Sequence, residues 1–327
     1  MEKNFYVITP VFNPAGYKSR VTLYHQFANY MASCGAKLIT IELQYGELPF
    51  EVTDANNPNH IQVRTNSVLW HKENLINVAA SRLPLDWQYM AWIDADLRFV
   101  NENWIYDTCR ALQFHPVVQM FAQALDLSPN NEVLRTHEGI GWAVQNGFID
   151  QENVYKKMYN EQFQSYFHTC SVESKTPKHL YHPGFAWAIR KEAYDGLGGL
   201  LDFPVLGSAD QHMAHAFVGK MSQTIHQKYN ENYKKRLMEW QDRCNKVIKC
   251  NLGYINGSIL HYWHGSKKDR GYTTRFNILI KHQYEPAKHI EKDWQGVYRW
   301  TDRDYPMHYD IMRYFGSRRE DQTGLLN

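Results

Sequence analysis

The chain has 327 residues, of which 43% are hydrophobic and 14% aromatic, so it can bury a sizeable core. Its formal net charge of +2 gives no global electrostatic argument for a nucleic-acid partner. An odd set of five cysteines (34, 109, 170, 244 and 250) without a CxxC pair, and the absence of a long apolar run, argue against a disulfide framework, a signal peptide and a membrane span, so we expect a cytoplasmic protein.

The first 125 residues alternate between short apolar runs and helical patterns. Strands are predicted at 5–8, 37–43, 61–64, 89–93 and 117–122, and helices at 17–33, 72–82 and 104–114. The first helix is predicted to end at Cys34-Gly35, because glycine favours the left-handed conformation after a helix. Strands joined by helices at this spacing pair in parallel through right-handed crossovers, which predicts an open, mostly parallel α/β sheet.

Beyond residue 125 this alternation stops. The sequence is polar and loop-like over 126–180, with one possible helix at 151–167, and it is dense in glycine and aromatic residues over 182–220. Helical composition returns over 226–249, and a strand is predicted at 258–262, whereas the tail beyond 285 shows no clear period. We therefore predict one domain with inserted segments rather than two separate domains.

The clearest candidate for a metal site is the segment 89–96, in which an apolar run leads into Asp94 and Asp96. Ligands of open α/β sheets bind beyond the carboxyl ends of the strands, where two carboxylates one residue apart can face a single cation. Carboxylate oxygens suit Mg²⁺ or Mn²⁺ that is shared with phosphate oxygens. The alternative is an ordinary acidic turn or helix cap, which a bare pair of this kind favours; the apolar run and the position at a strand end make the two interpretations about equally supported.

A second segment, 182–190, alternates small and aromatic residues before a predicted helix. Gly184 would let a ligand approach the backbone closely, and Trp187 could stack on the face of a sugar. The alternative is a core strand with Trp187 packed inside, and the segment taken alone favours that alternative.

The segment 207–212 places Asp210 at a glycine-containing turn before a helix. A carboxylate on a turn between rigid elements can act as a general base. Aspartate is also among the best residues for capping a helix N-terminus, and the segment alone favours the cap.

The segment 261–272 combines histidines with a basic run. His264, close to a strand end, could complete a metal site that carboxylates begin, and Lys267, Lys268 and Arg270 could neutralise phosphate charge. The alternative is a solvated basic loop. No cysteine lies at ligand spacing from these histidines, which argues against structural zinc, and the sequence contains no Walker A, G-x-G-x-x-G, G-x-S-x-G or H-E-x-x-H motif.

In this order and at these spacings, the segments resemble the GT-A glycosyltransferases, especially the family 2 type and the galactosyltransferase-like branch. The resemblance covers about residues 5–100 and 180–275. Residues 7–13 resemble the strand that begins the nucleotide site of that family, and 70–77 resemble its helix with a nucleotide-contacting lysine and asparagine. One departure is the pair Ala209-Asp210, where the family often has Glu-Asp.

The resemblance implies an α/β fold of the GT-A type, which is a Rossmann-like open mixed sheet flanked by helices, here with helical insertions. Residues 1–125 would form the nucleotide-sugar-binding half, and 126–180 an inserted region. Residues 181–284 would form the acceptor and catalytic half, with the helical insertion 226–249, and 285–327 would be a C-terminal extension.

The activity that the resemblance implies is the transfer of a sugar from a nucleotide-diphosphate donor to an acceptor hydroxyl, with inversion. Asp96 and His264, with Asp94, would hold Mn²⁺ or Mg²⁺, Asp210 would be the general base, and a basic loop over 265–275 would close over the donor. The expected donor-binding residues are Thr9, Pro10, Phe12, Asn13, Lys72, Asn77, Asp94, Lys267 and Arg270. The residues expected at the donor or acceptor sugar are Gly184, Trp187 and Asp210.

Other functions remain open at this point. A metal-dependent phosphohydrolase also uses clustered carboxylates and histidines, and a non-catalytic sugar-binding module would use the aromatic residues. The acceptor is expected to be a saccharide or glycoconjugate, with hydroxylated bases of DNA as the alternative. That alternative depends on a basic stretch with interleaved rings, which comprises Lys228, Tyr229, Tyr233, Lys234, Lys235, Arg236, Trp240, Arg243, Lys246 and Lys249. The same stretch also fits a solvated amphipathic helix, which we favour.

Overall fold

The computed structural model describes residues 4–149, 181–272, 274–302 and 305–322. A seven-stranded sheet forms its centre, with the strand order β10-β6-β9-β4-β1-β2-β3. Pairing is parallel except at β9, which lies antiparallel between β4 and β6. The strands are β1 (Phe5–Phe12), β2 (Leu38–Tyr45), β3 (His60–Thr65), β4 (Tyr89–Ile93), β6 (Val117–Gln119), β9 (Ala186–Arg190) and β10 (Leu252–Tyr254).

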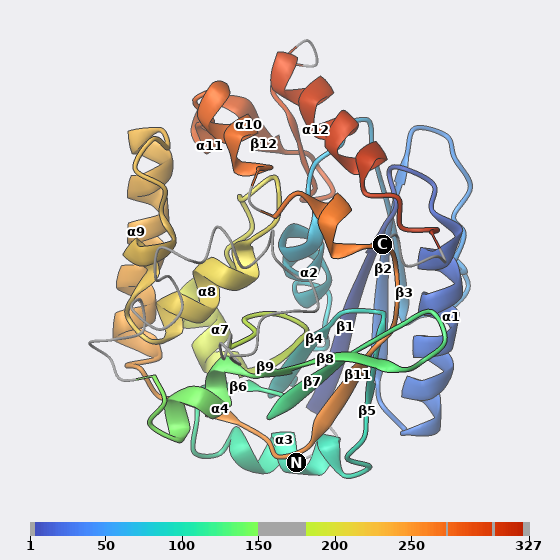
Figure 1. The fold of residues 1–327 in the computed structure, drawn as a ribbon, viewed down its shortest axis with the longest axis vertical. Coiled ribbons are helices and arrows are strands. Elements are labelled where there is room, and N and C mark those ends of the chain that lie inside the picture. The colour runs from blue at the N-terminus through green and yellow to red at the C-terminus, as the bar shows by residue number, and fades with distance from the viewer. Residues whose placement is uncertain (1–3, 150–180, 273, 303–304, 323–327) are drawn as a thin grey trace.

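Helices cover both faces of this sheet (Figure 1), because alternate residues of each strand point to opposite sides. Phe5 and Val7 of β1 pack in one core with residues of α1 and α3, whereas Ile8 belongs to a second core with residues of α2, α8 and α9. The open mixed sheet flanked by helices, predicted from the sequence, is confirmed. The helices are α1 (Lys18–Ser33), α2 (Lys72–Ala80), α3 (Trp104–Ala111), α7 (Lys191–Leu197), α8 (Ala209–Phe217) and α9 (Glu231–Val247).

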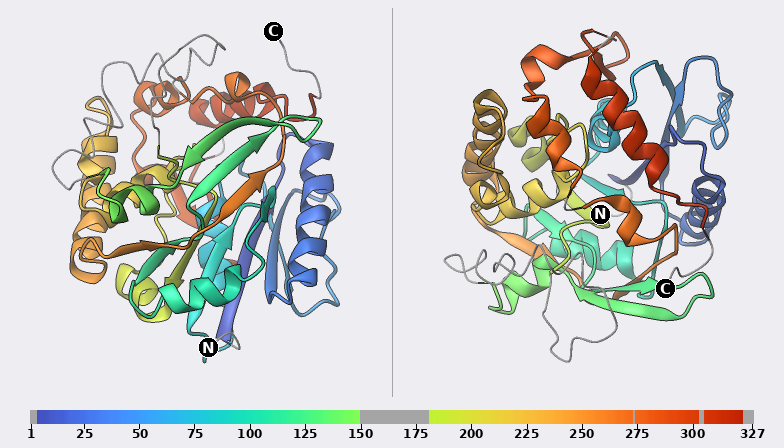
Figure 2. Two further views of the ribbon diagram at one scale, coloured as in Figure 1. Left: turned by 60° about the horizontal axis from the view of Figure 1, so that its bottom comes forward. Right: turned by 45° about the horizontal axis from the view of Figure 1, so that its top comes forward.

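A second sheet has the strand order β5-β11-β7-β8. It lies next to the first sheet, and its strands face the viewer in the left panel of Figure 2. Its strands are β5 (Leu97–Phe99), β7 (Gln123–Leu127), β8 (Val133–Glu138) and β11 (Ser258–His261). The register pairs His261 of β11 with Asp126 of β7 on one side and with Leu97 of β5 on the other. This sheet therefore brings three distant segments of the chain together at one point.

The region 126–180 contains more regular structure than the sequence predicts. Strand β8 and the short helix α4 (Ile140–Gln145) lie within it, whereas the helix expected at 151–167 falls outside the described residues. Strand β8 gave no apolar signal because it is an edge strand, and its two apolar residues, Val133 and Leu134, are exposed.

The tail beyond 285 is also folded. Its regular elements are too short to produce a sequence period, apart from α12, which buries Met307, Ile311 and Phe315 at helical spacing. Helix α12 crosses the upper part of the molecule in Figure 1. The elements after the second sheet are η3 (Lys267–Arg270), α10 (Phe276–Lys281), α11 (Pro286–His289), β12 (Ile290–Lys292), β13 (Tyr298–Trp300) and α12 (Pro306–Ser317).

Helix α9 accounts for the basic stretch. It packs on the core through Tyr233, Leu237, Trp240 and Cys244, which are buried at helical spacing. Tyr233 and Trp240 are each 1% exposed, so these rings are not available for stacking on bases, and the amphipathic-helix alternative is the correct one. In the described part of the chain, no helix combines the length and the apolar character needed to span a bilayer.

Candidate active site

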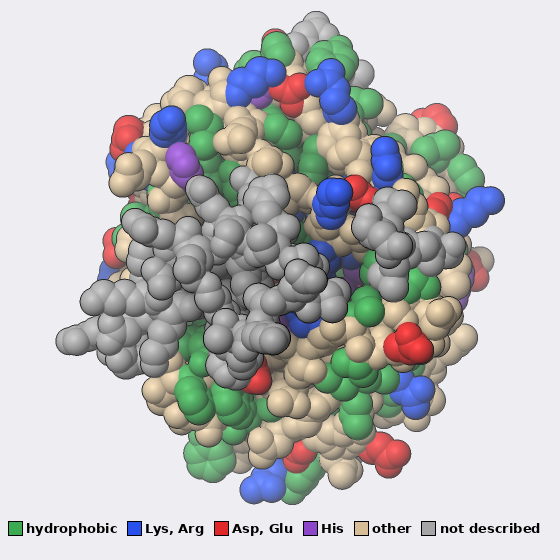
Figure 3. All heavy atoms as spheres, viewed as in Figure 1, with side chains coloured by type: hydrophobic (Ala, Val, Ile, Leu, Met, Phe, Trp, Pro, Cys, Tyr) green, Lys and Arg blue, Asp and Glu red, His purple; other side chains and the backbone are tan. Residues whose placement is uncertain are grey.

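A cavity of about 970 Å³ lies beyond the carboxyl ends of β1 and β4, where the fold predicts a ligand site. In Figure 3, lysine and arginine side chains lie around a hollow near the middle of the face. Segments from the whole chain line the cavity, including the last described residues. The predicted site residues that line it are Pro10, Phe12, Asn13, Lys72, Asp94, Asp96, Asp210, His264, Lys267 and Arg270.

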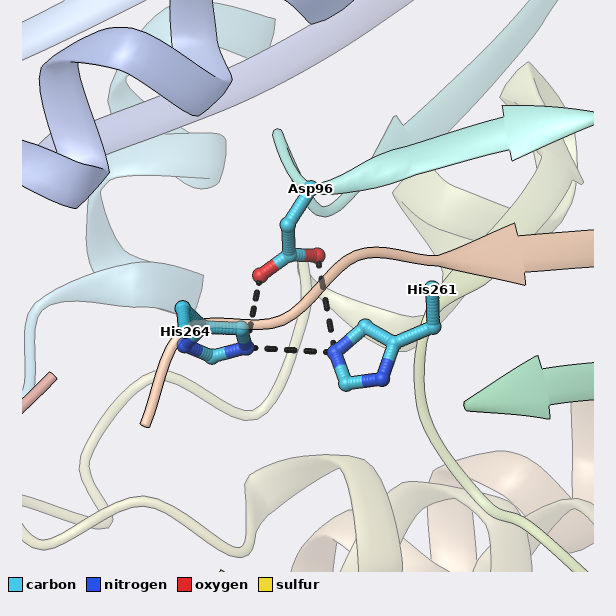
Figure 4. Close-up of side chains that lie close together, drawn as sticks. All are labelled: Asp96, His261 and His264. Carbon is cyan, nitrogen blue, oxygen red and sulfur yellow. Dashed lines mark hydrogen bonds and ion pairs between the residues drawn. The ribbon is translucent and has the colours of Figure 1, made fainter. Parts of the chain in front are cut away.

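Asp96, His261 and His264 converge on one point at the floor of this cavity (Figure 4). His264 Nε2 lies 3.0 Å from Asp96 Oδ2 and 3.1 Å from His261 Nε2, and His261 Nε2 lies 3.9 Å from Asp96 Oδ1. The pairing of β5 with β11 produces this cluster, since the backbone N–H of Tyr262 donates to the carbonyl oxygen of Asp96. Three ligand atoms of these residues lie within 4.8 Å of one another.

A carboxylate lies on the opposite side of each imidazole, within hydrogen-bond distance of His261 and at a longer distance from His264, whose Nδ1 is also contacted by Arg270 Nη2 at 3.0 Å. Asp126 Oδ1 lies 2.7 Å from Nδ1 of His261, and Glu320 Oε2 lies 3.8 Å from Nδ1 of His264. Both carboxylates are buried, and each is also paired with a basic side chain. A carboxylate behind a histidine fixes the ring and its tautomer, an arrangement that almost all metal-ligating histidines share. The arrangement leaves Nε2 of both rings directed at Asp96.

The chemistry of these atoms fits a divalent cation. Asp96 Oδ1 is buried and has no hydrogen-bond partner among the described residues. Burial and then the Arg270 guanidinium lower the pKa of His264 to about 4, so its imidazole is neutral at pH 7, which is the ligand form. Burial would raise the pKa of Asp96, but His264 and His261 outweigh it and lower that pKa, so the carboxyl is ionised. Two imidazoles with one carboxylate suit Mn²⁺ better than Mg²⁺.

The structure brings the predicted ligands Asp96 and His264 together but places Asp94 elsewhere. The carboxylate of Asp94 forms an ion pair with Lys72, and it is not part of the cluster. His261, which was not among the expected ligands, takes a place in the cluster instead. Its signal in the sequence is its position at the end of a predicted strand, three residues before His264.

Two buried arginines form a basic wall without ion-pair partners. Arg270 and Arg275 are 6% and 7% exposed, and no carboxylate of the described residues lies within ion-pair distance of either guanidinium. Arg270 Nη2 contacts the ring of His264, and Arg275 donates to Ser208 Oγ and Tyr314 OH. Among the described residues, the Nε atoms of both arginines have no hydrogen-bond partner. Buried cations that no carboxylate neutralises indicate an anionic ligand.

Lys267 differs from these arginines, although it also lines the cavity. It forms an ion pair with Asp126, which also receives hydrogen bonds from two histidines. Lys268 is exposed and does not line the cavity. The basic loop is therefore only partly turned toward the site.

Asp210 is the second residue of α8 and is not its N-cap, because Ser208 occupies that position. Its Oδ1 accepts a hydrogen bond from the backbone N–H of Gln211 at 2.8 Å, and its Oδ2 lies against Gly184. A Cβ atom at Gly184 would lie 2.7 Å from this oxygen. Gly184 therefore leaves room for the carboxylate of Asp210 at the cavity wall.

Backbone strain accumulates beside Asp210. Phe185 and Ser208 have φ values of 78° and 71°, in the left-handed region that side chains other than glycine rarely adopt. Phe185 stacks on His182, with ring centroids 3.7 Å apart, and both line the cavity. Such strain persists only where the surroundings enforce it and is concentrated at functional sites.

Four of the predicted site residues are not part of the cavity lining: Gly184, which lies against the Asp210 carboxylate, and Thr9, Asn77 and Trp187. Thr9 donates to the carbonyl oxygen of Ile93, and Asn77 exchanges hydrogen bonds with the backbone of Leu200. Trp187 is 2% exposed and packs between Trp92 and Phe217, so the core alternative is correct for this residue. These side chains support the walls of the site from behind.

Aromatic rings form another part of the wall, beside the basic residues, since the Arg318 guanidinium lies over the ring of Trp70. Phe12 and Trp70 meet edge to face with ring centroids 5.5 Å apart, and Phe315 of α12 stacks on Trp70 at 6.1 Å. All three line the cavity. The sequence did not predict the contribution of Phe315, since it lies more than 300 residues after Phe12.

No family model matches the chain, and no curated protein matches its sequence. Among solved structures it is similar to a Drosophila β1,4-galactosyltransferase 7 in complex with xylobiose, with 14% identity, 64% of this chain and 58% of that chain covered, and a TM-score of 0.32. It is similar to TarS of S. aureus in complex with UDP-GlcNAc, with 12% identity, coverage of 85% and 64%, and a TM-score of 0.38. A third is the 4-diphosphocytidyl-2C-methyl-D-erythritol synthase of Anaerococcus prevotii, with 10% identity, coverage of 79% and 90%, and a TM-score of 0.35.

These similar structures include nucleotide-sugar transferases of the GT-A type, the class that the sequence motifs resemble. The chain spans less than two thirds of the length of the galactosyltransferase and TarS chains.

Proposed function

We propose that the protein is a metal-dependent glycosyltransferase that moves a sugar from a nucleotide-diphosphate donor onto an acceptor hydroxyl. One observation carries the proposal: the Asp96–His261–His264 cluster, the unpaired Arg270 and Arg275, and the carboxylate of Asp210 all face one cavity. A cation site beside basic residues suits a diphosphate, and a separate carboxylate suits the removal of a proton.

The donor diphosphate would lie against Arg270 and Arg275. Arg270 Nη2 now lies 2.9 Å from Nε2 of His264, the atom that would face a cation. Binding of a cation there requires the guanidinium to turn away, and an anionic ligand in the cavity would hold it in its new position. The nucleoside would lie along the aromatic wall of Phe12 and Trp70, near Pro10 and Asn13.

Asp96, His261 and His264 would hold Mn²⁺ in preference to Mg²⁺. When bound, such an ion supplies electrostatic stabilisation of the negative charge that develops on a leaving diphosphate. Asp126 and Glu320 keep the two imidazoles in place for this purpose. Lys72 holds the carboxylate of Asp94 outside the cluster, and both residues would face the donor.

Asp210 would act as the general base. Its Oδ2 takes the proton of the acceptor hydroxyl while the acceptor oxygen forms a bond to the anomeric carbon. The bond between that carbon and the diphosphate oxygen breaks, and the nucleoside diphosphate leaves with the electron pair. A single displacement of this kind inverts the anomeric configuration. The wall from Gln223 to Tyr229 offers amide, hydroxyl and imidazole groups to a saccharide or glycoconjugate acceptor.

The test is a panel of nucleotide-sugars incubated with the protein and Mn²⁺, with and without EDTA. We expect release of nucleoside diphosphate with one donor or a few, abolished by EDTA. The matched control is Asp195→Asn, since Asp195 is an exposed carboxylate that pairs with Lys191 outside the cavity, and this variant should behave as the parent does. Release of nucleoside monophosphate or phosphate would indicate a phosphohydrolase instead. Nucleotide binding that is unaffected by EDTA would contradict the metal site.

A further inference from the structure

Glu73 is a buried carboxyl group that the proposed reaction does not use. It is the second residue of α2, it is 3% exposed, and it lines the cavity. Its neighbour Lys72 is turned toward Asp94, with which it forms an ion pair. The Glu73 carboxyl forms no ion pair with any described residue, and its hydrogen bond is to its own backbone N–H.

The charges that face Glu73 are Lys72 on its own helix, Asp94 beyond β4 and Asp210 on α8. Burial raises the pKa of the Glu73 carboxyl to about 8, and Asp210 and Asp94 act in the same direction, against the effect of Lys72. At pH 7 the group is therefore a neutral carboxylic acid, which has an O–H to donate as well as oxygens that accept.

The position of Glu73 indicates what it would contact. Lys72, Asp94 and Asp210 line the same cavity as Glu73. In the proposed reaction the ion pair of Lys72 and Asp94 would lie near the donor, and Asp210 would activate the acceptor hydroxyl. The group that passes between them in the reaction is the transferred sugar. A sugar hydroxyl both donates and accepts hydrogen bonds, as a neutral acid does, whereas a diphosphate is better matched by the arginines.

We propose that Glu73 is a specificity-determining residue whose carboxylic acid hydrogen-bonds one hydroxyl of the transferred sugar. This inference rests on the proposed glycosyltransferase function. A site with a buried donor rejects an analogue that lacks the matching hydroxyl, because the donor is then left without a partner. Glu73 would thus select among donor sugars that share the same nucleotide.

The first experiment needs no substrate. Glu73→Gln keeps the shape and a donor but does not titrate. Between about pH 5 and 8 the unfolded chain releases the Glu73 proton while the native protein retains it, so the stability of the unmodified protein falls as pH rises. The unfolding constant of the unmodified protein, divided by that of Glu73→Gln, should therefore increase by up to tenfold per pH unit in this window. If this ratio of unfolding constants does not change with pH, Glu73 is not a neutral acid in the native protein, whatever activity the protein has.

The second experiment uses the donor identified in the panel and analogues of it that lack one hydroxyl of the transferred sugar. With the full donor, Glu73→Ala should lower kcat/KM by about thirtyfold and Glu73→Gln by about threefold. With the analogue that lacks the hydroxyl contacted by Glu73, the unmodified protein and Glu73→Ala should have nearly equal kcat/KM values. The same loss for Glu73→Ala on every analogue would overturn the specificity role. If Glu73→Ala does not fold, the same comparison is made with Glu73→Leu, which removes the donor but fills the space, and an equal loss on every analogue has the same consequence.

The two experiments separate the possible failures. Absence of turnover with every nucleotide-sugar would remove the glycosyltransferase proposal and the sugar contact with it, but the stability ratio would still report whether Glu73 is neutral. Turnover with normal discrimination in both Glu73 variants would remove the inference alone.

Discussion

At the scale of single residues, the position of Asp210 depends on the missing side chain of Gly184. The carboxylate occupies the space that a Cβ atom would need, and the φ angle of Gly184 is one that other residues adopt. Glycine is therefore required at this position because the Asp210 carboxylate lies so close, and not because of the backbone conformation. This makes the pair a sensitive place to test the general base.

Asp210→Asn should lower the rate of transfer by about 10²- to 10⁴-fold, because the amide cannot accept the proton of the acceptor hydroxyl. Donor affinity and melting temperature should change little, since the amide keeps the shape of the side chain and its hydrogen bond to Gln211. Measuring all three quantities on the one variant decides the role. A transfer rate close to that of the parent would exclude Asp210 as the base.

Gly184→Ala should lower the transfer rate by about tenfold or more. The new methyl group would displace the Asp210 carboxylate, which can rotate away without moving the backbone. The melting temperature should stay close to that of the parent, as it should for the control Gly316→Ala, where nothing lies within 4 Å of the new atom. In an Asp210→Asn background, Gly184→Ala should lower the transfer rate little further. Equal losses in both backgrounds would show that the two residues act independently.

The sequence predicts some of these residues better than others. Asp96 could be found because carboxylates that follow an apolar run mark a strand end, and His264 because it precedes a basic loop. Trp187 was ambiguous, since a ring in a glycine-bounded segment fits a core as well as a ligand site. Glu73 carries no signal, because its chemistry comes from burial, which depends on the whole fold.

At the scale of elements, the register of β11 on β7 orients one member of the cluster, His261. The parallel pairing sets Asp126 opposite His261, and paired residues point to the same face of a sheet. A slip by one residue would turn Asp126 away from the imidazole. The strand β7 thus determines the orientation of a ligand that belongs to β11.

Asp126→Asn should weaken Mn²⁺ binding by about 10- to 100-fold, because His261 loses the charged partner that fixes its ring. Titration of the protein with Mn²⁺ by calorimetry measures this directly, without any substrate. Asp195→Asn serves as the control, because it removes a carboxylate of α7 outside the cavity. An unchanged Mn²⁺ affinity in Asp126→Asn would mean that His261 is not a ligand.

Most elements of the first 125 residues were predictable because buried parallel strands and amphipathic helices leave strong patterns. The strand β4 was predicted with its observed bounds. The strand β8 and the tail were missed for different reasons: β8 is an exposed edge strand, and β12 and β13 are three residues long. The pairing of β7 with β11, separated by more than 130 residues, leaves no local pattern in the sequence.

At the scale of the whole molecule, the last described residues contact the first turn of helix α1 beside the cavity. Glu320 pairs with Arg20 of α1 and approaches His264, and the carboxylate of Asp321 accepts hydrogen bonds from the backbone of Lys18 and Ser19. The backbone of the first turn of α1 is therefore satisfied by the tail. Binding at the cluster should consequently stabilise the molecule as a whole.

Mn²⁺ at a hundred times its dissociation constant should stabilise the native state by about 2.7 kcal/mol, provided that the unfolded chain does not bind it. The melting temperature should rise by several degrees, and EDTA should reverse the rise. Asp96→Ala should not respond to Mn²⁺, because the cluster loses its carboxylate. The same increase in Asp96→Ala as in the parent would place the cation elsewhere.

The bond between Arg20 and Glu320 also bears on the order in which the protein acquires its activity. The two residues are 300 positions apart, so a growing chain can make this contact only after residue 320 has been synthesised. During translation, the sheet can form well before the ribosome has released residue 320, but His264 will still lack its carboxylate partner. Nascent chains stalled before that point should therefore fold in part and yet fail to hold the cation tightly. The chain would hold the cation tightly only once Glu320 can reach His264.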